Sequence, residues 1–191
     1  MANVKGDLEG LNKLTKMLKD DYTLKVGILG SRARSPHDSK GGITNAELGA
    51  VHEFGASINV TDKMRGWFWH NYGINKSNEP IKIPARSFLW MPIVDQLSFN
   101  NPKMQGFKKY IWKQLFVKNA PQQFYATLGA MALDAIEWAF QTNGGGMWRP
   151  LSNFTESQFS RRRKKGIPQI LTNTGNLRRS MSFKILKGGQ G

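Results

Sequence analysis

The sequence predicts an α+β fold, with helices packed on a mainly antiparallel sheet, and three observations lead to this prediction. Amphipathic helical patterns recur along the chain and are strongest over residues 120–142. Short segments in which apolar and polar residues alternate, such as 22–28, are typical of half-buried strands. The two kinds of segment show no regular strand–helix–strand repeat. With 191 residues, the chain can bury one sizeable core, and residues 1–191 are expected to form one domain.

The first half of the chain begins with two segments of contrasting period. Leucines recur at helical spacing over residues 7–19, where Asp7 is placed to cap an N-terminal helix. Residues 22–28 then alternate as a strand. The stretch "TNAE" from Thr44 to Glu47 has the spacing of a capping box, in which each of the two side chains bonds a backbone N–H. It predicts a helix that ends at Gly55.

Two short strands and an aromatic excursion are expected next. Ile58 and Val60 indicate a short strand, and Ile81 and Ile83 indicate an edge strand that Pro84 ends, because proline donates no ladder hydrogen bond. The segment between these strands, residues 61–80, has more aromatic residues than a loop requires, and we call it the aromatic excursion. Its aromatic side chains either form a small local core or provide an interface, since Trp and Tyr are enriched at interface hot spots. They are Trp67, Phe68, Trp69 and Tyr72.

The second half of the chain contains the clearest helix. An amphipathic pattern predicts a helix over 103–118, and a longer one is predicted over 120–142, with Asn119 as its cap. The residues "NGGG" from Asn143 end this long central helix. Residues 181–185 alternate again and predict a closing strand. The apolar stripe of the long helix comprises Phe124, Leu128, Met131, Ala135 and Ala139.

Charge restricts the class of partner more than it restricts the fold. The formal net charge is +15, and residues 156–191 carry nine Lys or Arg against one Glu, which gives this basic C-terminal region a charge of +8. Such a field favours nucleic acid or another anionic surface. The chain has no cysteine, its first ten residues lack the apolar core of a signal peptide, and no run approaches the ~18 apolar residues of a membrane span. Synthesis in the cytoplasm and no membrane partner are expected.

Patterns for catalysis and metal binding are incomplete in this sequence. "HEFG" from His52 to Gly55 begins like a zinc-protease helix, but Ala56 stands where the second histidine is required. His37 and His70 have no ligand-like spacing, and the chain lacks both cysteine and the G-x-S-x-G pattern of a serine nucleophile. His52 is more simply explained by packing or a hydrogen bond at a helix end. We therefore predict no catalytic residue, no metal ligand and no cofactor.

The stretch "LTNTGNLRRSMSF" allows two interpretations. If Thr174 begins a helix, its free N–H groups beside Arg178 and Arg179 could bind phosphate. Alternatively, Thr174 caps a short turn, Leu177 packs inward and the arginines point into solvent. The preceding basic cluster could neutralise nucleic-acid phosphates or be a solvated segment. It comprises Arg161, Arg162, Arg163, Lys164 and Lys165.

Three stretches, taken in order, resemble the tail-completion or neck proteins of tailed bacteriophages, including the virion morphogenesis group. They are "NAELGAVHEFGASI" from Asn45, "IKIPARSFL" from Ile81, and "WRPL" from Trp148 followed by "LTNTGNLRRSMSF". Each motif is weak alone, whereas the ordered set spans nearly the whole chain and is fairly specific. The family pattern implies proline at position 87, where this chain has Ser87. The matching residues are Gly49, His52, Glu53, Phe54, Gly55, Ile83, Pro84, Ala85, Arg86, Phe88, Leu89, Trp148, Pro150, Leu151, Thr174, Gly175, Leu177, Arg178 and Ser180.

The resemblance implies a curved sheet packed by helices, and motif residues that serve architecture rather than catalysis. It also implies a non-enzymatic structural protein in the neck or tail of the virion, made in the host cytoplasm. Such a protein forms a homo-oligomeric ring, hexameric or twelve-fold, between the head connector and the tail proteins, with contact to packaged DNA also possible. The candidate interfaces are the excursion, the cluster at 161–165 and Arg179. The alternative hypothesis is a basic nucleic-acid-binding protein that uses the 161–165 cluster.

Overall fold

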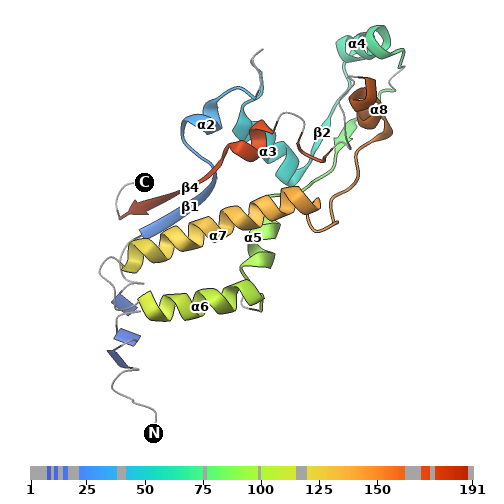
Figure 1. Ribbon diagram of the computed structural model, residues 1–191. Helices are drawn as coiled ribbons and strands as arrows, with labels where there is room; N and C mark the ends of the chain where they lie inside the picture. Colours follow the sequence, from blue (N-terminus) through green and yellow to red (C-terminus); the bar gives the residue numbers. More distant parts are fainter. Residues whose placement is uncertain are drawn as a thin grey trace.

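Figure 1 shows a computed structural model of the protein, which describes residues 8–9, 11–12, 15–16, 22–37, 42–74, 77–98, 100–114, 120–161, 169–172 and 175–188. The fold is α+β, as the sequence predicts, and its strands pair antiparallel. In the described part of the chain the strands form two separate two-stranded sheets. One pairs β1 (Tyr22–Ile28) with β4 (Met181–Lys187), and the other pairs β2 (Ala56–Ile58) with β3 (Ile81–Ile83).

Helix α7 (Ala120–Thr142) packs along the β1–β4 sheet, and α6 (Pro102–Gln114) lies on the side of α7 away from that sheet (Figure 1). Within the predicted N-terminal helix at 7–19, the six described residues are helical, but Leu8 and Leu11 are exposed, and Leu14 and Leu18 lie outside the described residues. The proposed caps Asp7 and Asn119 also lie outside them. The remaining helices are α2 (Ser31–Arg34), α3 (Asn45–Phe54), α4 (Asp62–Tyr72), α5 (Trp90–Gln96), α8 (Asn153–Arg161) and α9 (Asn176–Arg179).

Several local predictions are confirmed. The Thr44 side chain accepts a hydrogen bond from the Glu47 N–H, and the Glu47 carboxylate accepts one from the Thr44 N–H, so the capping box at the start of α3 is complete. The long helix α7 has the predicted bounds, and its stripe residues are buried or half-buried. Strands β1 and β4 pair in full register, from Tyr22 opposite Lys187 to Ile28 opposite Met181.

The structure differs from the local predictions at several places. The aromatic excursion is largely helical: α4 begins after Thr61, whose hydroxyl accepts the Met64 N–H, and ends at Gly73. The short strand predicted at 58–60 lies at Ala56–Ile58 instead. Helices α5 and α8 were not predicted. Pro92 lies in the first turn of α5, where a missing N–H does no harm, so it does not break that helix.

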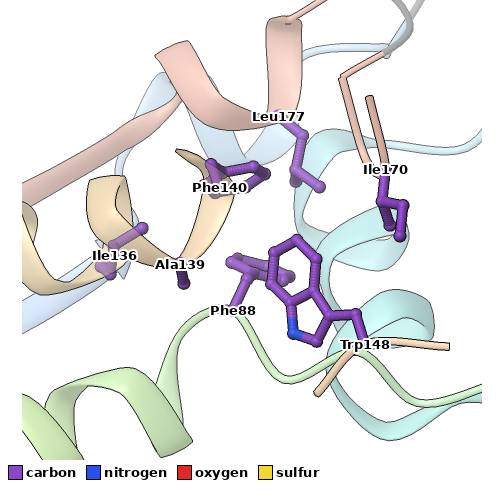
Figure 2. Close-up of a cluster of buried hydrophobic side chains, with 7 residues drawn as sticks. All are labelled: Phe88, Ile136, Ala139, Phe140, Trp148, Ile170 and Leu177. Carbon is purple, nitrogen blue, oxygen red and sulfur yellow. The ribbon is translucent and has the colours of Figure 1, made fainter. Parts of the chain in front are cut away.

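The core lies where α7 meets segments from distant parts of the sequence (Figure 2). Phe88, from the segment before α5, packs against Phe140 of α7 with ring centroids 5.5 Å apart, and Trp148 meets Phe140 edge-on. The cluster also contains Ile136 and Ala139 of α7, Leu177 of α9, and Ile170. Away from it, α4 and α8 protrude together at one end of the molecule, beyond the β2–β3 ribbon (Figure 1). We call this protruding part, residues 56–74, 77–83 and 153–161, the arm.

Candidate functional site

The motif residues meet in one place, which we call the motif junction: Glu53, Arg86, Ser87, Phe88 and Trp148. These residues come from the end of α3, the segment between β3 and α5, and the segment after α7. The Arg86 N–H donates to the His52 carbonyl over 2.7 Å, which links the first motif directly to the second. The Trp148 indole N–H donates to the Ser87 carbonyl over 3.0 Å, which links the second to the third.

Glu53 is the central polar group of this junction. Its side chain is buried, with the residue only 7% exposed, and both carboxylate oxygens accept two hydrogen bonds. One oxygen accepts the Ser87 hydroxyl over 2.5 Å and the Trp90 N–H over 2.9 Å, and the other accepts the N–H groups of Phe88 and Leu89 over 2.9 and 3.0 Å. A carboxylate is well suited to this position, because it offers only acceptors to the four donors at the start of α5.

Ser87, where the resemblance implies proline, has two roles in the same network. Its hydroxyl donates to Glu53 and accepts the Met91 N–H over 3.0 Å. It therefore satisfies one of the backbone donors that a helix start leaves unpaired. Proline could make neither bond, so serine at this position has a local structural reason.

Arg86 is the buried cation of the junction. Its Nε donates to the Arg149 carbonyl over 2.9 Å and its Nη2 to the Pro150 carbonyl over 3.0 Å. Burial lowers the pKa of the Arg86 guanidinium. These bonds hold the segment after Trp148 against the segment before α5. Leu151, the last residue of "WRPL", packs on the edge of the core.

The glycine and phenylalanine of "HEFG" differ in their surroundings. Gly55 has φ +77°, and an added Cβ there would lie 2.9 Å from the Ala85 N and the Ile83 O. Glycine is thus required both by the backbone conformation and by the close approach of the second motif. At Gly49 an added Cβ would lie 2.7 Å from the Ile28 side-chain end and in ordinary contact with Leu177 and Phe88. Phe54, by contrast, is exposed and contributes nothing to the core.

His52 packs at the end of α3, as one of the two proposed alternatives expected. Among the described residues, its buried Nδ1 has no hydrogen-bond partner. Burial lowers the pKa of His52 below its ordinary value, and the positive charge of Arg86 and His37 lowers it further. The neutral imidazole therefore belongs to the folded state.

The final motif surrounds α9. Gly175, at φ +73°, precedes this helix, Leu177 packs inward as predicted, and the Ser180 hydroxyl donates to the Leu177 carbonyl over 2.6 Å. The proposed cap Thr174 lies outside the described residues. The expectation that both arginines point into solvent is wrong for Arg178. This side chain forms a two-pronged ion pair with Glu137 of α7, in which Nε and Oε2 lie 2.7 Å apart.

The aromatic residues of α4 differ in how far they are buried. Phe68 and Tyr72 are half-buried and pack against Phe154 of α8, with ring centroids 6.0 and 5.2 Å apart. They form a small core that holds the arm together. Trp67 touches Phe68 and Tyr72 with ring edges but remains 51% exposed, and Trp69 is 64% exposed.

Sequence reasoning missed a second exposed apolar surface, on α5. Trp90 is 67% exposed, and Met91 and Val94 of the same helix are exposed with it. Residues three and four positions apart lie close together on a helix, so Val94 is a neighbour of both Met91 and Trp90, and the three side chains form one surface. The spacing within "WMPIVD" is the signal that could have identified it. We call it the α5 surface.

The basic residues are described only in part. Arg162, Arg163, Lys164 and Lys165 lie outside the described residues, and Arg161 ends α8. Arg179 is exposed on α9. The described residues contain no group of three or more His, Asp or Glu side chains able to hold a metal ion. Nor does any helix among them have the length and apolar character needed to cross a membrane.

Comparisons of the chain with protein-family models, with curated proteins and with solved structures give no match.

Proposed function

We propose that the protein is a non-enzymatic structural subunit of a phage neck or tail, which forms a ring and docks to connector and tail proteins. The observation that supports this proposal best is the motif junction. Its buried charged side chains form hydrogen bonds within the chain: the Glu53 carboxylate accepts from four donors, and the Arg86 guanidinium donates to two carbonyls. Residues used in this way maintain architecture, which is the role that the resemblance implies for them.

The two exposed apolar surfaces support an assembly role. Trp67 and Trp69 lie on the protruding arm, whereas the α5 surface belongs to helix α5, which lies beside the C-terminal half of α7 (Figure 1). A ring of identical subunits requires two different surfaces on each chain, because each subunit contacts the next through a heterologous interface. We propose that the arm of one subunit and the α5 surface of another provide such interfaces. The basic C-terminal region then faces neighbouring proteins or packaged DNA.

Deletion of the gene from the phage that carries it tests the assignment. We expect electron microscopy of the lysate to show filled heads beside unattached tails, and complementation by a plasmid copy to restore virions. Normal virions in the deletion lysate would refute the neck assignment.

Substitution at the surfaces tests how the subunits meet. We expect Trp67→Ser with Trp69→Ser, or Trp90→Ser with Val94→Ser, to keep the folded monomer but abolish complementation. Ile43→Ser is the matched control, because Ile43 is an exposed apolar residue on neither surface. If both double variants complement as well as the control does, neither surface is an assembly interface.

A further inference from the structure

The β1–β4 ribbon has two free edges. In the described part of the chain each of its strands pairs with the other one and with no third strand. Among the same residues, no backbone group from outside the ribbon bonds to the backbone of either strand. Each strand therefore has one edge along which N–H and C=O groups point away from the ribbon without a partner. With seven residues in each strand, such an edge is about 23 Å long.

Helix α7 covers one face of the ribbon and leaves these edges open. The helix contacts both strands, so it lies over the middle of the ribbon. A Cβ added at Gly129 of α7 would lie 2.6 Å from the Phe183 ring, which shows how closely helix and ribbon approach. Lys25 and Lys184 are paired with each other and exposed, and they lie on the opposite face, because successive residues of a strand alternate in direction.

The edges of this ribbon lack the features that prevent a sheet from pairing with another chain. Such features are very short strands, proline, a bulge, or a charge that points inward. The β2–β3 ribbon has two of them, since its strands have three residues each and Pro84 follows β3. Strands β1 and β4 contain no proline and pair without interruption over seven positions. The lysines at the centre of the ribbon, Lys25 and Lys184, point away from α7 rather than inward.

We infer that the free edge of β4 in one copy of the chain pairs with the free edge of β1 in a second copy, so that the ribbons of successive copies join into one antiparallel sheet. This inference rests on the proposed assembly into a ring and adds a third contact to those of the arm and the α5 surface. The two edges are different surfaces on opposite sides of the ribbon, as a heterologous interface requires. Because β1 and β4 run antiparallel, strand direction continues to alternate from copy to copy around a ring.

The dimensions of the ribbon and its helix favour a second copy as the partner. Two strands are about 10 Å wide, and helices pack with their axes about 8–10 Å apart. Joined ribbons therefore place the α7 helices of neighbouring copies at packing distance, without a gap between them. Each copy also supplies the helix that covers its own part of the apolar face, which an added peptide strand alone would leave exposed. Both strands present apolar residues to this face, so one register keeps like beside like; they are Leu24, Val26, Phe183 and Ile185.

Cross-linking between single-cysteine chains tests this inference, because the natural chain has no cysteine. The test pair is Thr23→Cys in one chain and Lys184→Cys in another chain that carries a tag of different size. Both positions are exposed, one on each strand of the ribbon. The matched control pair is Ser57→Cys and Lys82→Cys, which are exposed and stand on the two strands of the protected β2–β3 ribbon. Each chain has one cysteine, so every cross-link joins two copies.

A short bifunctional maleimide is added to two samples of each mixed pair. One is the purified full-length protein, and the other is particles from the deletion phage complemented with both chains. Thermal unfolding of each variant checks that the fold is retained. We expect the test pair to give a dimer of one tagged and one untagged chain, in severalfold higher yield than the control pair gives. Each cysteine chain of the test pair, treated alone, should give no such excess.

Two outcomes would overturn the inference. The first is a test pair that cross-links no more than the control pair in either sample. The second is an equal yield from the Thr23→Cys chain alone, which would mean that two β1 edges meet in a two-fold contact. The neck assignment is judged separately. Unattached tails in the deletion lysate without a cross-link would retain it, and normal virions with a cross-link in the purified protein would refute it and keep the edge pairing.

Discussion

Replacing Glu53 with glutamine should destabilise the protein far more than a change of one atom suggests. The substitution keeps the size of the side chain and replaces one acceptor oxygen with an NH2 group, which is a donor. Each carboxylate oxygen accepts two hydrogen bonds in the native structure. Whichever oxygen is replaced, two native donors then face a donor.

The expected loss follows from the number of bonds. A hydrogen bond to a charged group contributes about 1.5–3 kcal/mol, and a buried donor left unpaired costs about 1–3 kcal/mol. Two such bonds are lost in Glu53→Gln, and some relaxation at the half-buried Leu89 and the exposed Trp90 offsets part of the loss. We expect a decrease of about 3 kcal/mol in the free energy of unfolding. For a chain of this size that corresponds to a fall in Tm of about 6–12 °C.

Calorimetry and urea unfolding measure this loss, with Glu47→Gln as the control. Glu47 lies on the same helix and also accepts backbone and hydroxyl hydrogen bonds, but it is exposed. The control should therefore change Tm much less. If Glu53→Gln lowered Tm no more than Glu47→Gln does, the view that the buried carboxylate holds α3 to α5 would be refuted.

Three further predictions test the surroundings of the junction. Gly55→Ala should destabilise the protein by about 2–4 kcal/mol in urea unfolding, because the added Cβ would lie 2.9 Å from backbone atoms and φ is positive at this position. Gly66→Ala is the control: its Cβ would lie in open space on α4, so this variant should be stabilised by about 0.5–1 kcal/mol. Because the pKa of His52 is lowered in the folded state, the unfolded chain binds more protons below pH 6.5, and the free energy of unfolding should fall as the pH drops from 6.5. His52→Leu should flatten this part of the plot of stability against pH. An unchanged plot in the variant would contradict the conclusion that His52 is neutral in the folded state. A double-mutant cycle of Arg178→Ala and Glu137→Ala should give a coupling energy of about 1 kcal/mol, because this ion pair is partly exposed. A coupling energy near zero would show that the ion pair does not hold α9 to α7.

The elements that the sequence predicts correctly are those whose signal is local. The α7 stripe, the β1 and β4 alternation and the capping box of α3 each repeat or complete a pattern within a few residues. Helix α5 has seven residues with a proline in its first turn, so its local pattern is too short to outweigh the proline. The sequence pattern does not predict helix α4, because its aromatic residues face two sides, one toward α8 and one toward solvent.

The site is less predictable than the fold because its bonds join distant residues. Glu53 bonds residues 34 to 37 positions away, and no local pattern specifies such partners. Arg178 and Arg179 are adjacent and chemically identical, yet one pairs with Glu137 and the other lies beside Arg32. The helical turn between them sets this difference, since neighbours in a helix point in directions about 100° apart.

The two ends of the molecule also differ in how firmly they are held, and this bears on assembly. The core end rests on fully buried rings and on a ribbon of seven residue pairs. The arm rests on a ribbon of three residue pairs and on aromatic contacts between half-exposed rings. Regions with few buried apolar contacts open at a lower free energy than the core does. A partner that covers Trp67 and Trp69 would therefore stabilise the arm selectively, so that binding and ordering of this end occur together while the motif junction stays unchanged.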